Sequence, residues 1–299
     1  MINVVERLRN QTTIYDGAKG TFLAEYVINI GDPTDLLNLR KPSVVLDVHE
    51  AYINAGSGLI QTNTFCANSL RLALNGLGPD DAYQISRQGA YLATLAASNH
   101  NVLVAGDIGP TGKMPEPWGD TSVKDMTQAF IPQIEGLIAG GVHVLHIETM
   151  STIEEVLAAI AAKNKVNPNF PTMVSMSYEM TSPRGLRTMT GVAPSQLVTV
   201  ADEHQLLAYG ANCGRGLEGA EDLVRVLRNN NPNATLLMKL NAGIPILRGN
   251  QTVYEAEPKD MALYARQMHE LGVKIIGACC GSTPAHIEAM ANELQRLPV

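Results

Sequence analysis

The stretch VKIIGACCGSTPAHI, residues 273–287, combines a structural signal with a chemical one. Its first eight residues are largely apolar and β-branched, which is typical of a strand buried on both faces of a parallel sheet. Thr283 and Pro284 then have the residue types of a helix N-cap and a first helical position. The segment predicts a strand followed directly by a helix, with two adjacent cysteines, Cys279 and Cys280, where the strand ends.

Seven further apolar runs of the same kind precede this one along the chain. They are TTIYD (12–16), GLIQTNT (58–64), VLVAGDIG (102–109), VHVLHIET (142–149), TMVSMSY (172–178), LLAYGANC (206–213) and TLLMKLNA (235–242). Helical patterns lie between the runs. Apolar residues recur at helical spacing from Val123 until Gly140 and Gly141 end the pattern, and Ser151 and Thr152 carry a capping-box signature ahead of another helix.

Eight strand–helix units predict a (β/α)8 TIM barrel that occupies residues 1–299 as a single domain. The chain length suits this interpretation, because such barrels reach this size without dividing, and no Pro/Ser-rich linker interrupts the pattern. An open, doubly wound α/β sheet is the alternative. The phosphate-binding pattern GxxxxGK[ST], which often accompanies that fold, is absent from the sequence.

Composition excludes several classes of function. The net charge is −7, from 29 acidic and 22 basic residues without a basic cluster, which argues against a nucleic-acid partner. The first ten residues lack the apolar core of a signal peptide, and no apolar run approaches the ~18 residues of a membrane span. Four cysteines, two of them adjacent, make a poor disulfide framework, so we expect reduced thiols in a cytoplasmic enzyme that does not bind a membrane.

In a parallel barrel the functional residues lie at the carboxyl ends of the strands, around one mouth. The residues expected there are Asp16, Asn63, Asp107, Glu148, Tyr178, Cys213, Asn241, Cys279 and Cys280. Three thiols are the ligand set of a Zn²⁺ ion whose fourth position is open, and an open position is typical of catalytic zinc. A metal-bound thiol loses its proton. The three cysteines therefore predict a zinc centre that can turn a substrate thiol into a nucleophile.

The adjacent pair alone would favour a different interpretation, two small buried side chains, because free cysteine is often buried. Cys213, at the end of another strand two positions away in the ring, favours the metal. Adjacent residues of a regular strand point to opposite faces, so both can bind one ion only where the backbone leaves strand geometry. Gly277 and Gly281 flank the pair and permit that departure.

Several segments together resemble the homocysteine S-methyltransferase family, and most closely its cobalamin-dependent methionine synthase branch. They are DGAKGT (16–21), QTNTFCAN (61–68), DIGPTG (107–112), IETM (147–150), GANCG (210–214), NAG (241–243) and GACCGSTPAHI (277–287). The resemblance implies that Cys213, Cys279 and Cys280 hold zinc, that the sulfur of homocysteine becomes the fourth ligand, and that the product is methionine.

The resemblance also implies that Asp16 and Glu148 bind the amino-acid end of homocysteine. Gly17 and Gly20 bracket a turn, which includes Ala18, whose backbone N–H groups could receive a carboxylate, and Asn63 shapes the second loop of the substrate site. Simpler interpretations stay open: Asp16 could only form its turn, and Glu148 could only mark a helix terminus. Asn241 could lend its amide oxygen to zinc when substrate is absent, or could only cap the end of its strand.

Two residues depart from the family pattern. Lys19 stands where an apolar residue is usual, and it is either a solvated loop lysine or a contact to an acidic group of the methyl donor. Cys66 replaces a small residue; it is a spare thiol near the mouth and is not expected to bind the zinc.

The methyl donor does not follow from the barrel motifs alone. One barrel fills the 299 residues, and the DxH at Asp47–His49 lies in an apparent helix without the glycine of a cobalamin-binding loop. Because the motifs resemble the methionine synthase branch, whose donor is methylcobalamin, we expect a methyl-corrinoid on a separate partner protein. The alternatives are betaine or S-methylmethionine as donor, another thiol acceptor, or a non-catalytic zinc-binding subunit of a corrinoid methyltransferase complex.

Overall fold

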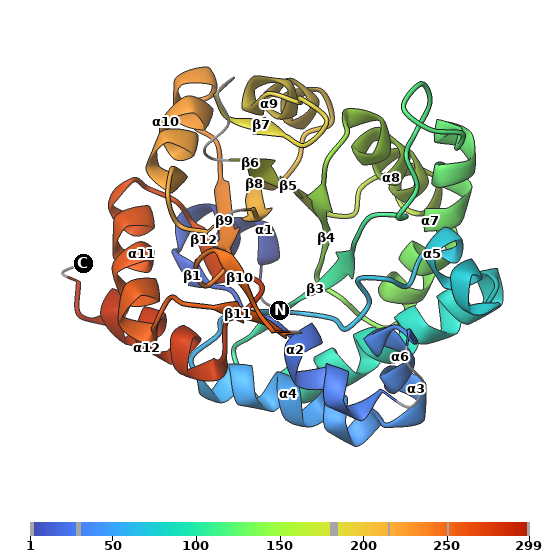
Figure 1. The fold of residues 1–299 in the computed structure, drawn as a ribbon, viewed down its shortest axis with the longest axis horizontal. Coiled ribbons are helices and arrows are strands. Elements are labelled where there is room, and N and C mark those ends of the chain that lie inside the picture. The colour runs from blue at the N-terminus through green and yellow to red at the C-terminus, as the bar shows by residue number, and fades with distance from the viewer. Residues whose placement is uncertain (1–2, 28–30, 180–184, 215, 250, 298–299) are drawn as a thin grey trace.

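A ring of eight parallel strands forms the centre of the computed structural model, which describes residues 3–27, 31–179, 185–214, 216–249 and 251–297 (Figure 1). The strands are β1 (Thr13–Ile14), β2 (Leu59–Gln61), β3 (Leu103–Ile108), β4 (Val144–Met150), β5 (Thr172–Met176), β8 (Ala208–Cys213), β9 (Leu236–Leu240) and β12 (Ile275–Ala278). Their order around the sheet is β1-β12-β9-β8-β5-β4-β3-β2. A parallel bridge between Tyr15, next to β1, and Leu59 of β2 joins the two ends of this order and closes the barrel.

The eight predicted strands are confirmed, and each is shorter than its apolar run; β4 alone passes the end of its run, by one residue, at Met150. The α-helices are α1 (Val4–Asn10), α2 (Gly20–Leu23), α3 (Leu37–Arg40), α4 (Pro42–Asn54), α5 (Ser69–Leu72), α6 (Pro79–Ala97), α7 (Val123–Ala139), α8 (Ile153–Val166), α9 (Pro194–Glu203), α10 (Ala220–Asn230), α11 (Pro258–Glu270) and α12 (Pro284–Gln295). The predicted helix starts are also confirmed. Thr152 accepts a hydrogen bond from the backbone N–H of Glu155, and Pro284 is the first residue of α12.

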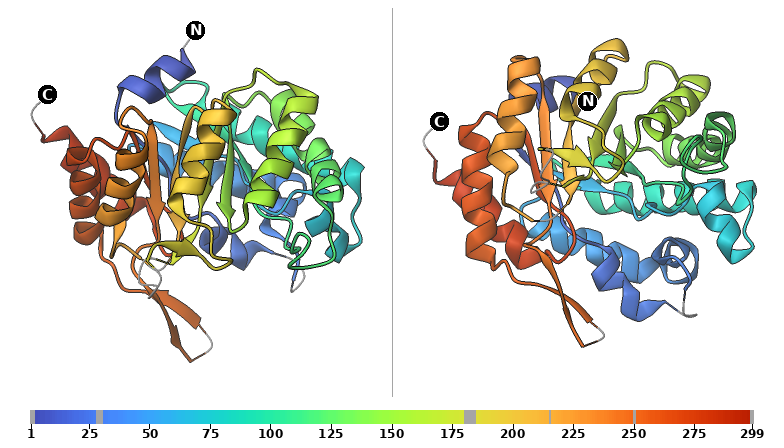
Figure 2. Two further views of the ribbon diagram at one scale, coloured as in Figure 1. Left: turned by 90° about the horizontal axis from the view of Figure 1, so that it is seen from above. Right: turned by 45° about the horizontal axis from the view of Figure 1, so that its top comes forward.

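Apolar side chains that point inward from the strands fill the barrel interior. This inner cluster includes Tyr15, Leu103, Val144 and Leu237, and Leu8 of α1 packs against it. Figure 2 shows α1 at the end of the barrel opposite the protruding hairpin described below. A larger apolar cluster lies between the strands and the surrounding helices. Because α1 covers the amino-terminal end of the barrel, the open end is the one where the strands terminate.

Two antiparallel hairpins at the open end of the barrel did not follow from the apolar pattern. They are β6 (Tyr178–Glu179) with β7 (Arg187–Thr188), and β10 (Pro245–Arg248) with β11 (Gln251–Tyr254). The β10–β11 hairpin projects from the barrel (Figure 2). A sequence signal for it exists, because Gly249-Asn250 is a two-residue hairpin dipeptide between two short runs.

The loop after β8 contains the sequence GRGLEG, residues 214–219, which matches the GxGxxG spacing of dinucleotide-binding sheets. Such sheets are open and bind their ligand where the strand order reverses. The closed ring of this protein has no such reversal. The three glycines of the loop adopt positive φ values of 71°, 101° and 79° and form the turn into α10. The barrel prediction is therefore confirmed over the open-sheet alternative despite this motif.

Within the described part of the chain, no helix combines the length and apolar character needed to cross a membrane.

Candidate metal centre and substrate cavity

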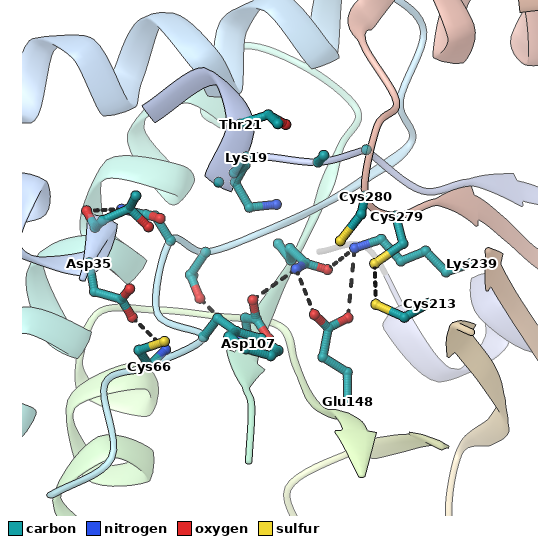
Figure 3. A pocket seen from close by; sticks show the side chains of 18 of the residues that line it. Lys19, Thr21, Asp35, Cys66, Asp107, Glu148, Cys213, Lys239, Cys279 and Cys280 are labelled. Carbon is teal, nitrogen blue, oxygen red and sulfur yellow. Dashed lines mark hydrogen bonds and ion pairs between the residues drawn. The ribbon is translucent and has the colours of Figure 1, made fainter. Parts of the chain in front are cut away.

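The three predicted zinc ligands lie together at the open end of the barrel. Cys213 is the last residue of β8, and Cys279 and Cys280 follow β12, with β9 between the two strands. The Sγ atoms of Cys213 and Cys279 are 2.6 Å apart, and the three sulfur atoms all lie within 4.8 Å of one another. All three are free thiols (Figure 3). In the described ranges, they are the group of metal-ligating side chains that is compact enough to hold an ion.

The backbone departs from strand geometry at both ends of this cluster. β12 ends at Ala278, before the cysteine pair, and Gly281 has a φ of 82°. A Cβ atom at Gly281 would lie 2.2 Å from Cγ of Tyr254, so the turn needs glycine for space as well as for its dihedral angle. The backbone therefore leaves strand geometry at the cysteine pair, as expected, and Gly281 permits it. Gly277 has another role, because a Cβ there would lie 2.7 Å from that of Tyr15.

Asn212 holds two strained residues in place. Cys213 has a φ of 57° and Thr149 a φ of 62°, values that cost non-glycine residues on the order of 1–3 kcal/mol each. The Asn212 Oδ1 atom accepts hydrogen bonds from the Thr149 backbone N–H (2.7 Å) and from the Ser175 hydroxyl (2.6 Å). Its Nδ2 donates to Thr149 Oγ1 (2.6 Å) and to Cys213 Sγ (3.4 Å). We call this arrangement the Asn212 clamp.

The donor set fits a zinc ion. A tetrahedral zinc lies about 2.3 Å from each thiolate sulfur, a spacing that three sulfurs this close can reach with small side-chain shifts. Hydrogen bonds from the Cys213 and Cys279 thiols lower the pKa of Cys280 to about 3, so the cluster favours a thiolate even on its own. Asn241 donates from Nδ2 to Gly214 O, and its buried Oδ1 has no hydrogen-bond partner among the described residues. That free oxygen fits the predicted ligand role of Asn241, which stays a prediction.

A cavity of about 420 Å³ extends from the cysteines across the barrel mouth (Figure 3). It is lined by Gly17, Ala18, Lys19, Gly20, Thr21, Thr34, Asp35, Gln61, Thr62, Asn63, Phe65, Cys66, Asp107, Glu148, Cys213, Lys239, Thr252, Tyr254, Cys279 and Cys280. The β10–β11 hairpin contributes Thr252 and Tyr254, so this unpredicted element forms part of the cavity wall.

A buried lysine, Lys239 of β9, lies in the floor of the cavity. Its Nζ donates to Gln61 Oε1, lies 3.6 Å from Asp16 Oδ1 and 3.7 Å from Glu148 Oε2, and sits over the ring of Tyr15. Burial alone would lower the pKa of Lys239, but the Glu148 and Asp16 carboxylates raise it above its ordinary value. Lys239 is therefore a fixed positive charge beneath the substrate cavity.

Two carboxylates next to Lys239 are incompletely hydrogen-bonded. The Gln61 amide nitrogen donates both to Asp107 Oδ2 (2.8 Å) and to Glu148 Oε1 (3.3 Å). The other oxygens, Asp107 Oδ1 and Glu148 Oε2, are buried without a hydrogen-bond partner among the described residues. Burial raises the pKa of Asp107, and the neighbouring Glu148 raises it further; burial also raises the pKa of Glu148. Lys239 Nζ lies 3.7 Å from Glu148 Oε2 without a hydrogen bond to it, so both oxygens can still accept a hydrogen bond from an ammonium group.

The predicted substrate residues border this region. Asp16 Oδ2 accepts from Lys19 Nζ (2.8 Å) and from the Gln61 backbone N–H (2.9 Å). The Ala18 backbone N–H donates to Ser282 Oγ (3.0 Å), while Gly17 packs against the same serine. Asn63 lines the cavity, but its amide donates to Thr34 O and Asn38 Oδ1, which ties the second loop to a neighbouring segment.

Sequence reasoning assigned no role to Gln61, Asp107 or Lys239, although each lies at the centre of the cavity. Signals were available, because Asp107, which was expected at the barrel mouth, is the second-to-last residue of β3, and Lys239 is the charged residue of an otherwise apolar strand. Cys66 lies apart from the cysteine cluster; its backbone N–H donates to Asp35 Oδ1, and burial raises the pKa of its thiol to about 12.

Lys19 is not a solvated loop lysine. Its side chain is only 6% exposed, and it extends into the cavity (Figure 3). The sequence left open a solvated lysine or a lysine that contacts the methyl donor, and the burial of Lys19 excludes the solvated lysine.

Comparison with known proteins agrees with this geometry. A family model described as homocysteine S-methyltransferase matches residues 13–294. The chain belongs to the homocysteine S-methyltransferase family. Among curated proteins it is similar to the methionine synthase of Mycobacterium leprae, with 26% identity over 98% of this chain, and to that of Mycobacterium tuberculosis, with 26% identity over 97%. The chain spans about 25% of the length of each of these relatives.

The fold is also that of solved family structures. The Escherichia coli homocysteine methyltransferase MmuM superposes in its oxidised form with a TM-score of 0.80 at 23% identity, covering 97% of this chain and 99% of that one. Its metallated form gives a TM-score of 0.78 at 22% identity, covering 95% and 96%. A methyltransferase from Methanosarcina mazei is more distant, with a TM-score of 0.61 at 11% identity, covering 98% and 97%.

The Asn212 clamp leads to a prediction about metal binding. Replacing Asn212 by Ala leaves the Thr149 backbone N–H without its partner and frees Cys213, so we expect a loss of about 1–3 kcal/mol in stability and a roughly 10- to 100-fold weaker affinity for Zn²⁺. Chelator competition and thermal unfolding measure the two effects. The exposed Asn54→Ala variant is the control, and wild-type zinc affinity in Asn212→Ala would show that the clamp is not needed.

Proposed function

We propose that this protein is a zinc-dependent methyltransferase that transfers a methyl group to the sulfur of homocysteine and releases methionine. The observation that carries the proposal is the presence, in one cavity, of three converging cysteine sulfurs and a buried carboxylate pair, each with one oxygen that takes part in no hydrogen bond among the described residues. A thiol-containing amino acid needs both features, the first for its sulfur and the second for its ammonium group. Membership of the homocysteine S-methyltransferase family supports the same reaction.

Cys213, Cys279 and Cys280 would hold the zinc, which when bound supplies the positive charge that keeps a coordinated thiol deprotonated near neutral pH. A free thiol has a pKa of about 8.5, so only a few per cent would otherwise be thiolate at pH 7. The chain's own part is to fix the three sulfurs through Gly281 and the Asn212 clamp, and to leave the side of the cluster that faces the cavity open.

Glu148 and Asp107 would hold the substrate ammonium group through Glu148 Oε2 and Asp107 Oδ1, the oxygens that take part in no hydrogen bond among the described residues. Asp16 takes part through its Oδ1, which also has no hydrogen-bond partner among the described residues, while its Oδ2 positions Lys19. Lys239 balances these negative charges from below, so that the cavity attracts a zwitterion instead of a simple cation.

For the methyl donor we propose a methyl-corrinoid carried on a partner protein. The barrel motifs resemble the methionine synthase branch, and the similarity to mycobacterial methionine synthases supports this choice. A donor presented by another protein must reach the cysteine cluster from the open end of the barrel, where the cavity lies.

The metal proposal is tested by zinc content. We expect about one Zn²⁺ per wild-type chain and loss of zinc and methyl transfer when Cys213, Cys279 or Cys280 is replaced by Ala, with the barrel still folded because its core does not involve the ion. Cys66→Ala provides a matched control, since that thiol lines the same cavity outside the cluster and should leave the zinc in place. Full zinc retention in all three ligand variants would refute the metal site.

The ammonium site is tested at Glu148. Replacing it by Gln removes one charge from the pair, so homocysteine affinity should fall by roughly 10- to 100-fold, equivalent to about 1.5–3 kcal/mol, while zinc content stays unchanged. Asp16→Asn should weaken binding in the same direction. The exposed Glu135→Gln variant is the control. Wild-type homocysteine binding by both Glu148→Gln and Asp16→Asn would assign these carboxylates another role.

The donor is tested with a panel of methylcobalamin, a methylated corrinoid protein, betaine and S-methylmethionine, each offered with homocysteine. We expect methionine to form with the methyl-corrinoids and the Cys280→Ala variant to give the background rate. Turnover with betaine or S-methylmethionine and none with either corrinoid would contradict the proposed donor.

A further inference from the structure

Lys19 is a second buried ammonium group in the cavity, and it differs from Lys239 in how it is partnered. Lys239 Nζ faces Gln61, Asp16, Glu148 and the ring of Tyr15. Lys19 Nζ makes one hydrogen bond to the described residues, to Asp16 Oδ2. An ammonium group has three donors, so Lys19 keeps donors available within the cavity that it lines.

A short hydrogen-bonded chain links Lys19 to the carboxylate pair. Asp16 Oδ2 accepts from both Lys19 Nζ and the Gln61 backbone N–H, and the Gln61 side chain donates to Asp107 and Glu148. A positive group with spare donors therefore lies close to two negative groups with spare acceptors. The α-carbon of an amino acid carries the complementary pair, an ammonium and a carboxylate on one atom.

One N–H group of the turn expected to receive a carboxylate already has a partner. The Ala18 N–H donates to Ser282 Oγ at 3.0 Å. Burial lowers the pKa of Lys19, because the charged ammonium is less well solvated in the cavity than in water. A further anionic partner would offset that loss of solvation. The cavity thus provides, beside that turn, a cation for the substrate carboxylate.

We propose that the Lys19 ammonium binds the α-carboxylate of the thiol acceptor and makes the site selective for α-amino acids over the corresponding amines. This inference deepens the proposed function and rests on it, since it takes the ammonium of the same substrate to lie at Asp107 and Glu148. It assigns Lys19 to the acceptor and not to the methyl donor.

The test uses two ligands without a free thiol, so that binding does not depend on a metal–thiolate bond. They are L-methionine and 3-(methylthio)propan-1-amine, which differs from it by lacking the carboxylate. Calorimetry with the wild-type protein should show tighter binding of methionine. In Lys19→Met the preference for methionine should fall by about tenfold or more, through weaker methionine binding and not through weaker amine binding.

Two further variants separate recognition from folding. Lys19→Gln can still donate to Asp16 Oδ2, so it preserves that contact while removing the charge, and it should lose the preference as Lys19→Met does. Lys113→Met changes an exposed lysine of the loop after β3 and should keep the preference for methionine. The role of Lys19 would be overturned if both Lys19 variants bound methionine and the amine equally more weakly, or if both kept the wild-type preference for methionine. Zinc binding and methyl transfer to homocysteine would then still support the proposed function. A wild-type protein that binds neither ligand and transfers no methyl group would overturn both.

Discussion

Backbone hydrogen bonding on both sides of β1 is the constraint on which the rest of the molecule depends. Thr13 N–H donates to Lys274 O on one side, and Gly58 N–H donates to Ile14 O on the other. The strand is only two residues long, yet it turns an eight-stranded sheet into a ring. Once the ring is closed, the carboxyl ends of all eight strands lie at the same end of the barrel, and residues far apart in sequence become neighbours. The cysteine cluster and the charged floor both follow from that closure.

The charged floor is stable only because its members neutralise one another. Asp16, Asp107, Glu148, Lys19 and Lys239 are all buried, and isolated charges in such surroundings would cost several kcal/mol each. Gln61 connects them, since it contacts four of the five. Its neutral amide can donate to carboxylates and accept from an ammonium at the same time, which no charged side chain could do. One oxygen of each carboxylate takes part in no hydrogen bond among the described residues, which leaves an acceptor site for the proposed ligand.

The eight strands and the cysteine centre could be predicted from the sequence because their signals are local. An apolar run such as residues 102–109 identifies a buried strand without reference to any other part of the chain, and the topology then places Cys213 beside Cys279. The charged network has no local signal. Lys239 and Gln61 lie 178 positions apart, and only the closed barrel shows that they are partners. The burial of Lys19 is likewise set by neighbours from other loops, whereas the β10–β11 hairpin had a local turn signal that the apolar pattern did not reveal.

The cysteine cluster and the Glu148 carboxylate are connected through β4. Glu148 precedes Thr149 directly, and Thr149 is held at positive φ by the same Asn212 side chain that contacts Cys213 Sγ. A shift of the Cys213 sulfur toward a bound ion would act on Asn212, and through Thr149 on the backbone that carries Glu148. Strain of this kind persists only where surrounding contacts over-determine it. The strained pair therefore constrains the distance between the sulfur cluster and the carboxylate, which is the distance that the proposed thiol-containing substrate would span.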